Sequence, residues 1–300
     1  MKVLIAGSSG MVGAAIGSRL QAQGHTVLPL VRPPRIAGPD QVAWNPETGE
    51  IDPEAAADAR AVINLSGASI ASGRWTESRK ALLRSSRIET TRKLVDGLAR
   101  LGSRPKVLVS ASAVGYYGNR GDELLTEESA PGDDFLARLV QEWESETLRA
   151  AEFGIRTVLF RFGVILSAKG GALAQMLGPF RMGIGGRLGS GRQWMSWISL
   201  ADAIRLLEEA IVNDQWSGAY NAVAPEAVTN AEFTRALGRV LHRPTLFPVP
   251  PAALRALFGE MAEAMLLASQ RVEPRRLMQA GYSYSHDRLE LALSDALTDS

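Results

Sequence analysis

Three glycines near the amino terminus have the spacing of a diphosphate-binding loop. The apolar run 3–6 leads into Gly7, and Gly10 and Gly13 follow before a helix-like stretch. Gly7 permits a tight turn, Gly10 lets the backbone approach a diphosphate, and Gly13 allows the helix to pack closely on the strand. Free N–H groups at the start of that helix attract the anion, so we expect the loop to hold a dinucleotide. The residues expected to contact it are Gly7, Ser9, Gly10, Met11, Val12 and Gly13.

A basic residue follows the second apolar run. Residues 26–31 are predicted as the second strand, and its end lies about twenty residues beyond the glycines, where a protein that binds NAD usually has Asp or Glu for the ribose 2′-hydroxyl. This chain has Arg32 there, with Arg35 close behind. A guanidinium suits a 2′-phosphate through paired, charge-assisted hydrogen bonds. The sequence therefore favours NADP over NAD, and the alternative is that both arginines are solvated loop charges.

Composition excludes several classes of protein. The 33 Lys and Arg nearly balance the 32 Asp and Glu, and no dense basic run carries aromatic residues, so nucleic acid is not an expected partner. The chain has no cysteine and only three separated histidines, which leaves no expected metal site. No apolar run approaches the roughly eighteen residues of a membrane span, and no signal-peptide layout is present. We expect a soluble cytoplasmic or organelle-matrix protein, with a small-molecule substrate and no membrane partner, and the sequence leaves a homodimer open.

Apolar runs alternate with helical patterns, which is typical of a doubly wound α/β fold with a parallel sheet covered on both faces. We expect an NADP-binding Rossmann core over residues 1–165. A smaller, mixed substrate-side lobe is expected over 166–300, with about 192–222 returning to the core and a helical region over 248–300. The expected strands after the second are 42–44, 61–65, 106–110 and 156–166, and the expected helices include 76–101, 142–153, 252–270 and 285–297.

Small and hydroxyl-bearing residues follow the fourth and fifth expected strands. Leu65, Ser66 and Gly67 would let a ribose of the cofactor approach the backbone. Ser110 stands at the end of the fifth expected strand and is predicted to contact the cofactor there. Because ligands meet a parallel sheet at the carboxyl ends of its strands, these residues are expected to border one site.

Two further residues beyond the fifth strand could carry catalysis. The Ser112 hydroxyl can polarise a carbonyl, and Tyr116 can move a proton if a cation lowers its pKa. We therefore predict Ser112 and Tyr116 as catalytic residues. The alternative is that Tyr116 and its neighbour Tyr117 pack beneath the nicotinamide or close the pocket.

Three charged residues are candidates for a functional or structural role, and the two arginines among them have two interpretations each. Arg87 could reach a cofactor phosphate or ribose from the helix between the fourth and fifth strands, and Arg161 could bind an anion from the sixth strand. For each arginine the alternative is a structural ion pair. Asp202 is predicted as a cap that accepts N–H bonds at the start of a helix, which is a structural role.

The chain resembles the short-chain dehydrogenase/reductases, and specifically their atypical extended, epimerase-like branch, which has its own C-terminal domain. The resemblance covers essentially the whole chain and implies a Rossmann fold, a nicotinamide cofactor, and oxidoreductase or epimerase chemistry. The motifs that carry it are 7–13, 64–68, 74–75, 86–88, 110–118, 189–191, 197–202, 218–225 and 269–274.

The chain departs from that family at its acid/base pair. Ordinary members use a tyrosine that transfers a proton and, four residues later, a lysine that lowers the phenol pKa and holds the ribose. This chain has Phe135 and Leu139 in the corresponding segment, and neither can do so. Two functions therefore remain. One is an NADP(H)-dependent oxidoreductase or epimerase acting on a small carbonyl or sugar-like substrate. The other is a non-catalytic NADP(H)-binding sensor or scaffold that binds a protein partner.

Overall fold

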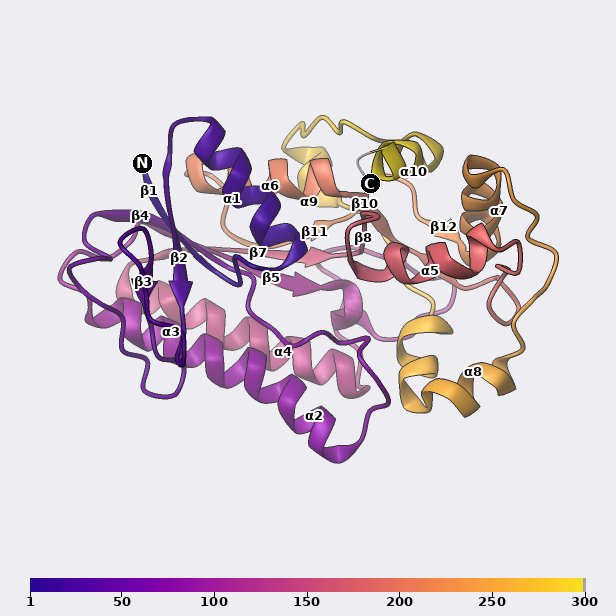
Figure 1. Cartoon of the computed structure of the whole chain (residues 1–300), viewed down its shortest axis with the longest axis horizontal. Coiled ribbons are helices and arrows are strands. Elements are labelled where there is room, and N and C mark those ends of the chain that lie inside the picture. The colour runs from indigo at the N-terminus through magenta and orange to yellow at the C-terminus, as the bar shows by residue number, and fades with distance from the viewer. Residues whose placement is uncertain (299–300) are drawn as a thin grey trace.

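A seven-stranded parallel sheet forms the centre of the molecule (Figure 1). The computed structural model describes residues 1–298. The strand order is β11-β7-β5-β4-β1-β2-β3, and every neighbouring pair is parallel. The order reverses between β1 and β4, which is where a sheet of this kind receives its ligand. The strands are β1 Lys2–Ala6, β2 Thr26–Val31, β3 Val42–Ala43, β4 Ala59–Asn64, β5 Val107–Ala113, β7 Arg156–Phe162 and β11 Gly218–Ala222.

Helices cover both faces of this sheet. Helices α1 (Met11–Ala22) and α6 (Leu200–Val212) lie on one face, and α3 (Thr90–Arg100) and α4 (Phe135–Leu148) lie on the other (Figure 1). Val3 of β1 packs in the core under α1 and α6, whereas Leu4 packs in the core under α3. Strands buried on both faces must be apolar nearly throughout, which is why they can be recognised in the sequence. The predicted doubly wound Rossmann fold is confirmed.

The predicted helix 76–101 is divided by a wide turn. Helix α2 runs over Glu77–Arg84, a π-helical turn η1 over Ser85–Glu89, and α3 continues from Thr90. The Thr90 hydroxyl donates to the carbonyl of Ser85, 3.1 Å away, across the wide turn. Such turns change the direction of the side chains they carry. Here the turn carries Arg87.

Other boundaries also differ from the predictions. The predicted strand 156–166 ends at Gly163, where a Cβ atom would lie 2.5 Å from the carbonyl oxygen of Ser196, and resumes as β8 (Val164–Leu166). Strand β8 leaves the sheet and pairs with β10 (Trp197–Ser199). Helix α4 begins at Phe135, well before the predicted residue 142, because Asp134 caps it by accepting a hydrogen bond from the Ala137 N–H.

The C-terminal part packs beside the sheet and returns to it. Helices α5 (Gly171–Arg181), α7 (Asn230–Leu241) and α10 (Leu289–Thr298) share a separate core with Trp197. Strand β11 and helix α6 belong to the central sheet and its cover, within the segment predicted to return to the core, and the division at residue 165 stays a prediction. Helix α8 (Pro251–Phe258) ends well before the predicted residue 270. The shorter elements are β6 Leu124–Leu125, β9 Trp194–Met195, β12 Val228–Thr229, β13 Arg271–Val272, α9 Arg275–Gln279, η2 Val114–Tyr117, η3 Arg149–Phe153 and η4 Ala262–Leu266.

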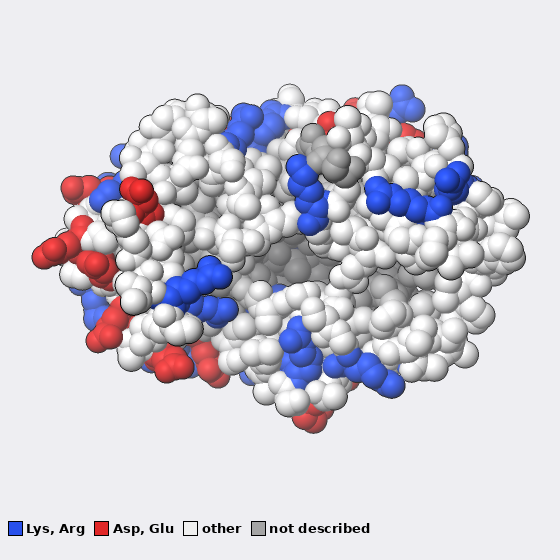
Figure 2. All heavy atoms as spheres, viewed as in Figure 1, with Lys and Arg blue, Asp and Glu red and all other residues white. Residues whose placement is uncertain are grey.

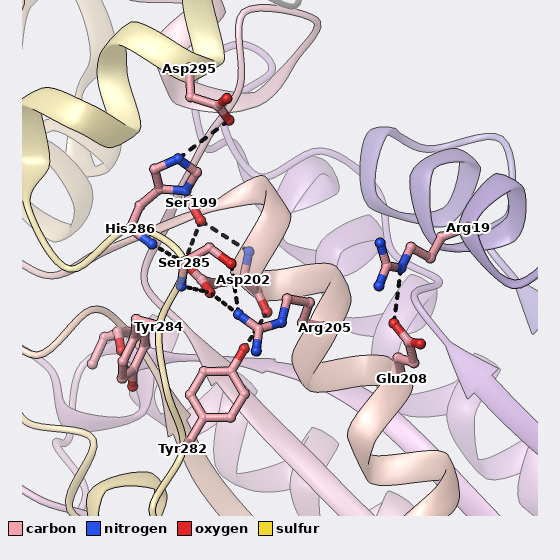
Figure 3. A network of polar contacts seen from close by, with 11 residues as sticks. Arg19, Ser199, Asp202, Arg205, Glu208, Tyr282, Tyr284, Ser285, His286 and Asp295 are labelled. Atoms are coloured by element: carbon pink, nitrogen blue, oxygen red, sulfur yellow. Dashed lines mark hydrogen bonds and ion pairs between the residues drawn. The ribbon is translucent and has the colours of Figure 1, made fainter. Parts of the chain in front are cut away.

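Asp202 ties the C-terminal segment to the core (Figure 3). Its carboxylate is fully buried and accepts hydrogen bonds from the backbone N–H groups of Ser285 at 2.7 Å and His286 at 3.0 Å. The cap of α6 is Ser199, whose hydroxyl accepts from the Asp202 N–H and donates to its carboxylate. The predicted structural role is right, but the N–H groups that donate to the Asp202 carboxylate belong to the C-terminal segment rather than to α6.

Candidate cofactor site

The glycine loop has the close approaches that its spacing predicted. Gly7 has φ +80°, and a Cβ atom there would lie 2.6 Å from the Leu65 carbonyl oxygen. A Cβ atom on Gly13 would lie 2.3 Å from the Gly7 carbonyl oxygen. Gly10 is the N-cap of α1, with no side-chain cap and no acidic residue in the first turn. The first N–H groups of α1 are therefore available to an anion.

A cleft of about 670 Å³ opens at the carboxyl ends of β1, β2 and β4. The glycine loop, the segment after β2 and the loop after β4 form its walls, with Trp44 and Leu82 adding apolar surface. Such a mixture of backbone donors, polar groups and aromatic surface suits a dinucleotide. The predicted cofactor residues that line this cleft are Gly7, Ser9, Gly10, Arg32, Leu65, Ser66 and Gly67.

Positively charged side chains border the cleft and lie on the same face of the molecule. Arg32 and Arg35 are exposed and lie on the cleft wall after β2. In Figure 2 Lys and Arg side chains lie around the central hollow, whereas Asp and Glu gather at the left-hand edge. A cleft bordered by one sign of charge attracts ligands of the other sign. The site is therefore suited to a phosphorylated ligand.

The remaining three residues of the glycine motif lie behind the loop. Val12 packs against the core under α1, and Gly13 packs on Gly7. Met11 faces Gly170, where an added Cβ atom would lie 3.4 Å from the Met11 sulfur. None of the three is among the residues that line the cleft, so their side chains support the loop from behind, while their backbone N–H groups form the first turn of α1.

A fully buried polar cluster fixes the end of β4. The Asn64 amide donates to the hydroxyls of Thr91 at 3.1 Å and Ser110 at 3.3 Å, and the Trp143 indole N–H also donates to Thr91. The side-chain Oδ1 of Asn64 accepts a hydrogen bond from the N–H of Ser66 in the cleft wall. Ser110, predicted as a cofactor residue, is completely buried in this cluster and positions the loop after β4. Asn64 and Thr91 were not predicted as site residues, although a buried asparagine at a strand end is a usable signal.

A second buried cluster surrounds Arg161. Its guanidinium makes two hydrogen bonds of 2.8 Å to the carboxylate of Glu144 on α4 and a third, of 3.0 Å, to the Tyr117 hydroxyl. The Ser112 hydroxyl donates to the same carboxylate, and the Tyr117 hydroxyl donates to the side-chain carbonyl of Asn221. Only 4% of Arg161 and of Ser112 is exposed. Of the two interpretations of Arg161, the structural ion pair is the arrangement found.

The protonation states in this cluster are fixed by burial and by the ion pair. Burial raises the pKa of Tyr117 to about 12, against the opposing effect of the Arg161 charge. Burial alone would lower the pKa of Arg161, but its hydrogen bonds and charge interaction with Glu144 outweigh this and raise it. Tyr117 therefore stays neutral and Arg161 stays charged at neutral pH, and neither is poised for proton transfer.

Tyr116 lies on the far side of α4 from the cleft. Its ring covers Arg161, with the guanidinium carbon 3.4 Å from the ring centre, and it borders a surface groove beside Gln141 and Ser145. At 100° per residue these positions are opposite Trp143, which contacts α3. Catalysis by Ser112 and Tyr116 stays a prediction, as does the alternative that Tyr116 and Tyr117 pack beneath the nicotinamide, because neither tyrosine is among the residues that line the cleft.

We therefore expect Tyr116→Phe to leave function almost unchanged. The variant keeps the ring over Arg161 and removes only the hydroxyl, so NADPH affinity and any turnover should stay within about twofold of the unaltered protein. Titration of NADPH fluorescence and a rate assay of NADPH consumption check this. A loss of turnover of more than about tenfold with unchanged NADPH affinity would restore Tyr116 as the proton donor.

Apolar side chains occupy the start of α4. Leu139 is fully buried, and Phe135 meets Trp75 edge-on with ring centres 5.4 Å apart. Both belong to a cluster that also contains Leu136 and Met261. The segment without the tyrosine and lysine thus packs as part of a small hydrophobic core.

Comparisons with known proteins agree with this architecture. The model of the NAD dependent epimerase/dehydratase family matches residues 3–222, and a domain of unknown function, DUF1731, matches residues 249–296. The chain is 47% identical over 296 residues to the epimerase family protein Mb2239 of Mycobacterium bovis, covering 99% of this chain and 97% of that protein. It is 37% identical to the human epimerase family protein SDR39U1, covering 98% of this chain and 99% of that one.

Solved structures give the same result. The crystal structure of human SDR39U1 with NADPH has a TM-score of 0.89 and 36% identity, with complete coverage of both chains. The nucleoside-diphosphate sugar epimerase from Corynebacterium glutamicum has a TM-score of 0.79 and 34% identity, covering 99% of this chain and 58% of that one. Within residues 1–298 no helix is long and apolar enough to cross a membrane, and no cluster of metal-ligating side chains occurs.

Proposed function

Because the chain belongs to the NAD-dependent epimerase/dehydratase family, we propose that it binds NADP(H) and acts on a small carbonyl or sugar-like substrate. The observation that carries the proposal is the cleft at the reversal of strand order, with the glycine loop at its centre and Arg32 on one wall. The NADPH-bound human relative supports the same cofactor. A cytoplasmic location and a homodimer stay predictions.

The residues of the cleft fit each part of the cofactor. The free N–H groups of the first turn of α1, just after Gly10, would bind the diphosphate, and the Arg32 guanidinium would bind the adenosine 2′-phosphate. Ser66 and Gly67 would flank a ribose on the opposite wall. Bound NADP(H) would supply or accept a hydride, while this chain's residues bind and orient it.

Hydroxyl groups that already donate hydrogen bonds within the protein favour a second function, a non-catalytic sensor. Ser110, Ser112 and Tyr117 all donate their hydroxyls to other protein groups, and the start of α4 is apolar. A protein that binds NADP(H) without transferring a hydride could still respond to it, because a ligand stabilises the conformation it prefers. In that case the cofactor-bound form would bind a protein partner.

Binding and turnover distinguish these functions. We expect calorimetry to give NADPH an affinity about 10- to 100-fold higher than that of NADH, since only NADPH offers the 2′-phosphate. At a hundredfold excess over Kd, NADPH should stabilise the fold by about 2.7 kcal/mol in thermal unfolding. NADPH consumption with aldehydes, ketones or sugar nucleotides would indicate the enzyme, and binding without turnover would indicate the sensor. Failure to bind either NADPH or NADP⁺ would refute both.

A further inference from the structure

Arg87 lies directly beside the cleft wall. It stands on the π turn η1, and an added Cβ atom on Gly67 would lie 3.1 Å from its guanidinium carbon. Gly67 is itself part of the cleft lining. A side chain at Gly67 would fill the space next to the guanidinium, so the glycine leaves this space open beside the cleft.

The guanidinium of Arg87 has few partners. It lies 5.4 Å from the ring centre of Trp143, and its one hydrogen bond within residues 1–298, to the Leu83 carbonyl, is long at 3.5 Å. Among residues 1–298 it forms no ion pair with a carboxylate. Burial lowers the pKa of Arg87 to about 10, and the nearby charge of Arg79 adds to this effect. A half-buried cation of this kind is incomplete without an oxygen-rich partner.

The strand order places Arg87 away from Arg32. Arg32 follows β2, whereas Gly67 and Arg87 lie at the loop after β4, and β1 with its glycine loop stands between them. A dinucleotide that crosses such a sheet at the reversal of strand order lays one half over each side. If Arg32 holds the adenosine half, Arg87 borders the nicotinamide half.

We propose that Arg87 holds the ribose-phosphate of the nicotinamide half of NADP(H). This inference rests on the proposed function and names the residue that orients the reactive end of the cofactor. The five N–H donors of a guanidinium suit hydroxyl and phosphate oxygens. Arg87 supplies this positive charge from the π turn η1. Leu139, which stands on α4 where ordinary family members have the ribose-binding lysine, is buried and apolar. Arg87 is thus proposed as a cofactor-binding residue, and its loss should weaken binding of one half of the cofactor only.

The test compares two ligands and three variants by calorimetry. Adenosine 2′,5′-bisphosphate carries the 2′-phosphate but lacks the nicotinamide half. We expect Arg87→Met to lower the affinity for NADPH at least about tenfold and to leave the affinity for the bisphosphate within about twofold of the unaltered protein. Arg87→Lys keeps the charge without the planar donor pair and should fall between Arg87→Met and the unaltered protein. Arg92→Met removes the same charge from the Arg92–Glu146 pair that joins α3 to α4 and should alter neither affinity.

Unfolding without ligand separates this role from a structural one. Arg87→Met should keep or raise the midpoint of thermal unfolding, because methionine retains the contact with Trp143 without an unpaired charge. The inference is overturned if Arg87→Met binds NADPH within twofold of the unaltered protein, or if it weakens both ligands equally. Failure of the unaltered protein to bind either ligand would instead refute the proposed function.

Discussion

Arg32→Asp should weaken NADPH binding by roughly 30- to 100-fold while leaving NADH affinity within about threefold. The guanidinium is exposed on the cleft wall after β2, where it can form two charge-assisted hydrogen bonds to a 2′-phosphate. Aspartate removes these bonds and places a negative charge beside the phosphate, whereas it can accept a hydrogen bond from the 2′-hydroxyl of NADH. The variant should therefore approach equal affinity for the two cofactors, as measured by calorimetry.

Salt dependence and a matched variant sharpen this result. The NADPH affinity of the unaltered protein should fall with ionic strength more steeply than that of Arg32→Asp, because salt screens an exposed charge pair. Arg60→Asp makes the same charge change at an exposed position near the amino end of β4, away from the cleft, and should alter neither affinity. Equal losses of NADPH and NADH in Arg32→Asp would contradict the assignment of the 2′-phosphate contact.

The sheet and the glycine loop could be predicted because local sequence encodes both. Strands buried on two faces are nearly continuous apolar runs, and β1 and β2 begin and end close to where those runs do. Gly7 and Gly13 occupy positions where a Cβ atom would clash with backbone, so their spacing carries the geometry of the turn. The position of Arg32 could be predicted because it stands at a characteristic distance along the chain from that turn, at the end of the second strand.

The directions of the polar side chains could not be predicted from strand ends alone. Ser110 and Ser112 stand at the expected end of β5, but a strand has two faces, and both hydroxyls point to the face covered by α3 and α4. Their alternation with the apolar Val107 and Val109 carries this information. The partner of Ser112, Glu144, lies 32 residues later, and only the packing of α4 brings them together.

The surroundings of Arg87 could not be predicted, because they depend on a π turn that has no recognisable pattern in the sequence. A regular helix over 76–101 is what the apolar spacing predicts, whereas the π turn at Ser85–Glu89 adds a residue to one turn and changes the direction of the side chains there. The sequence therefore placed Arg87 on the correct segment but could not choose between a cofactor contact and an ion pair. Its contacts with Gly67 and Trp143, without a carboxylate, argue against the ion pair.

Glu144→Leu should destabilise the fold by about 3–5 kcal/mol, since it leaves the Arg161 charge buried without its carboxylate. Urea unfolding at neutral pH measures the loss. The double variant Glu144→Leu with Arg161→Met removes both charges and should recover a large part of it, because two apolar side chains replace a buried pair at little cost. A double variant as unstable as Glu144→Leu alone would show that shape, and not the unpaired charge, causes the loss.

The same double variant tests whether the Arg161 cluster has any part in binding. Ser112, Glu144 and Arg161 satisfy one another beneath α4, and none of them lines the cleft of the glycine loop. If the cluster only supports the fold, the folded double variant should bind NADPH within about twofold of the unaltered protein, even though its stability differs. Loss of NADPH affinity in a fully folded double variant would mean that Arg161 or Ser112 reaches the cofactor, as their position at the sheet edge first predicted.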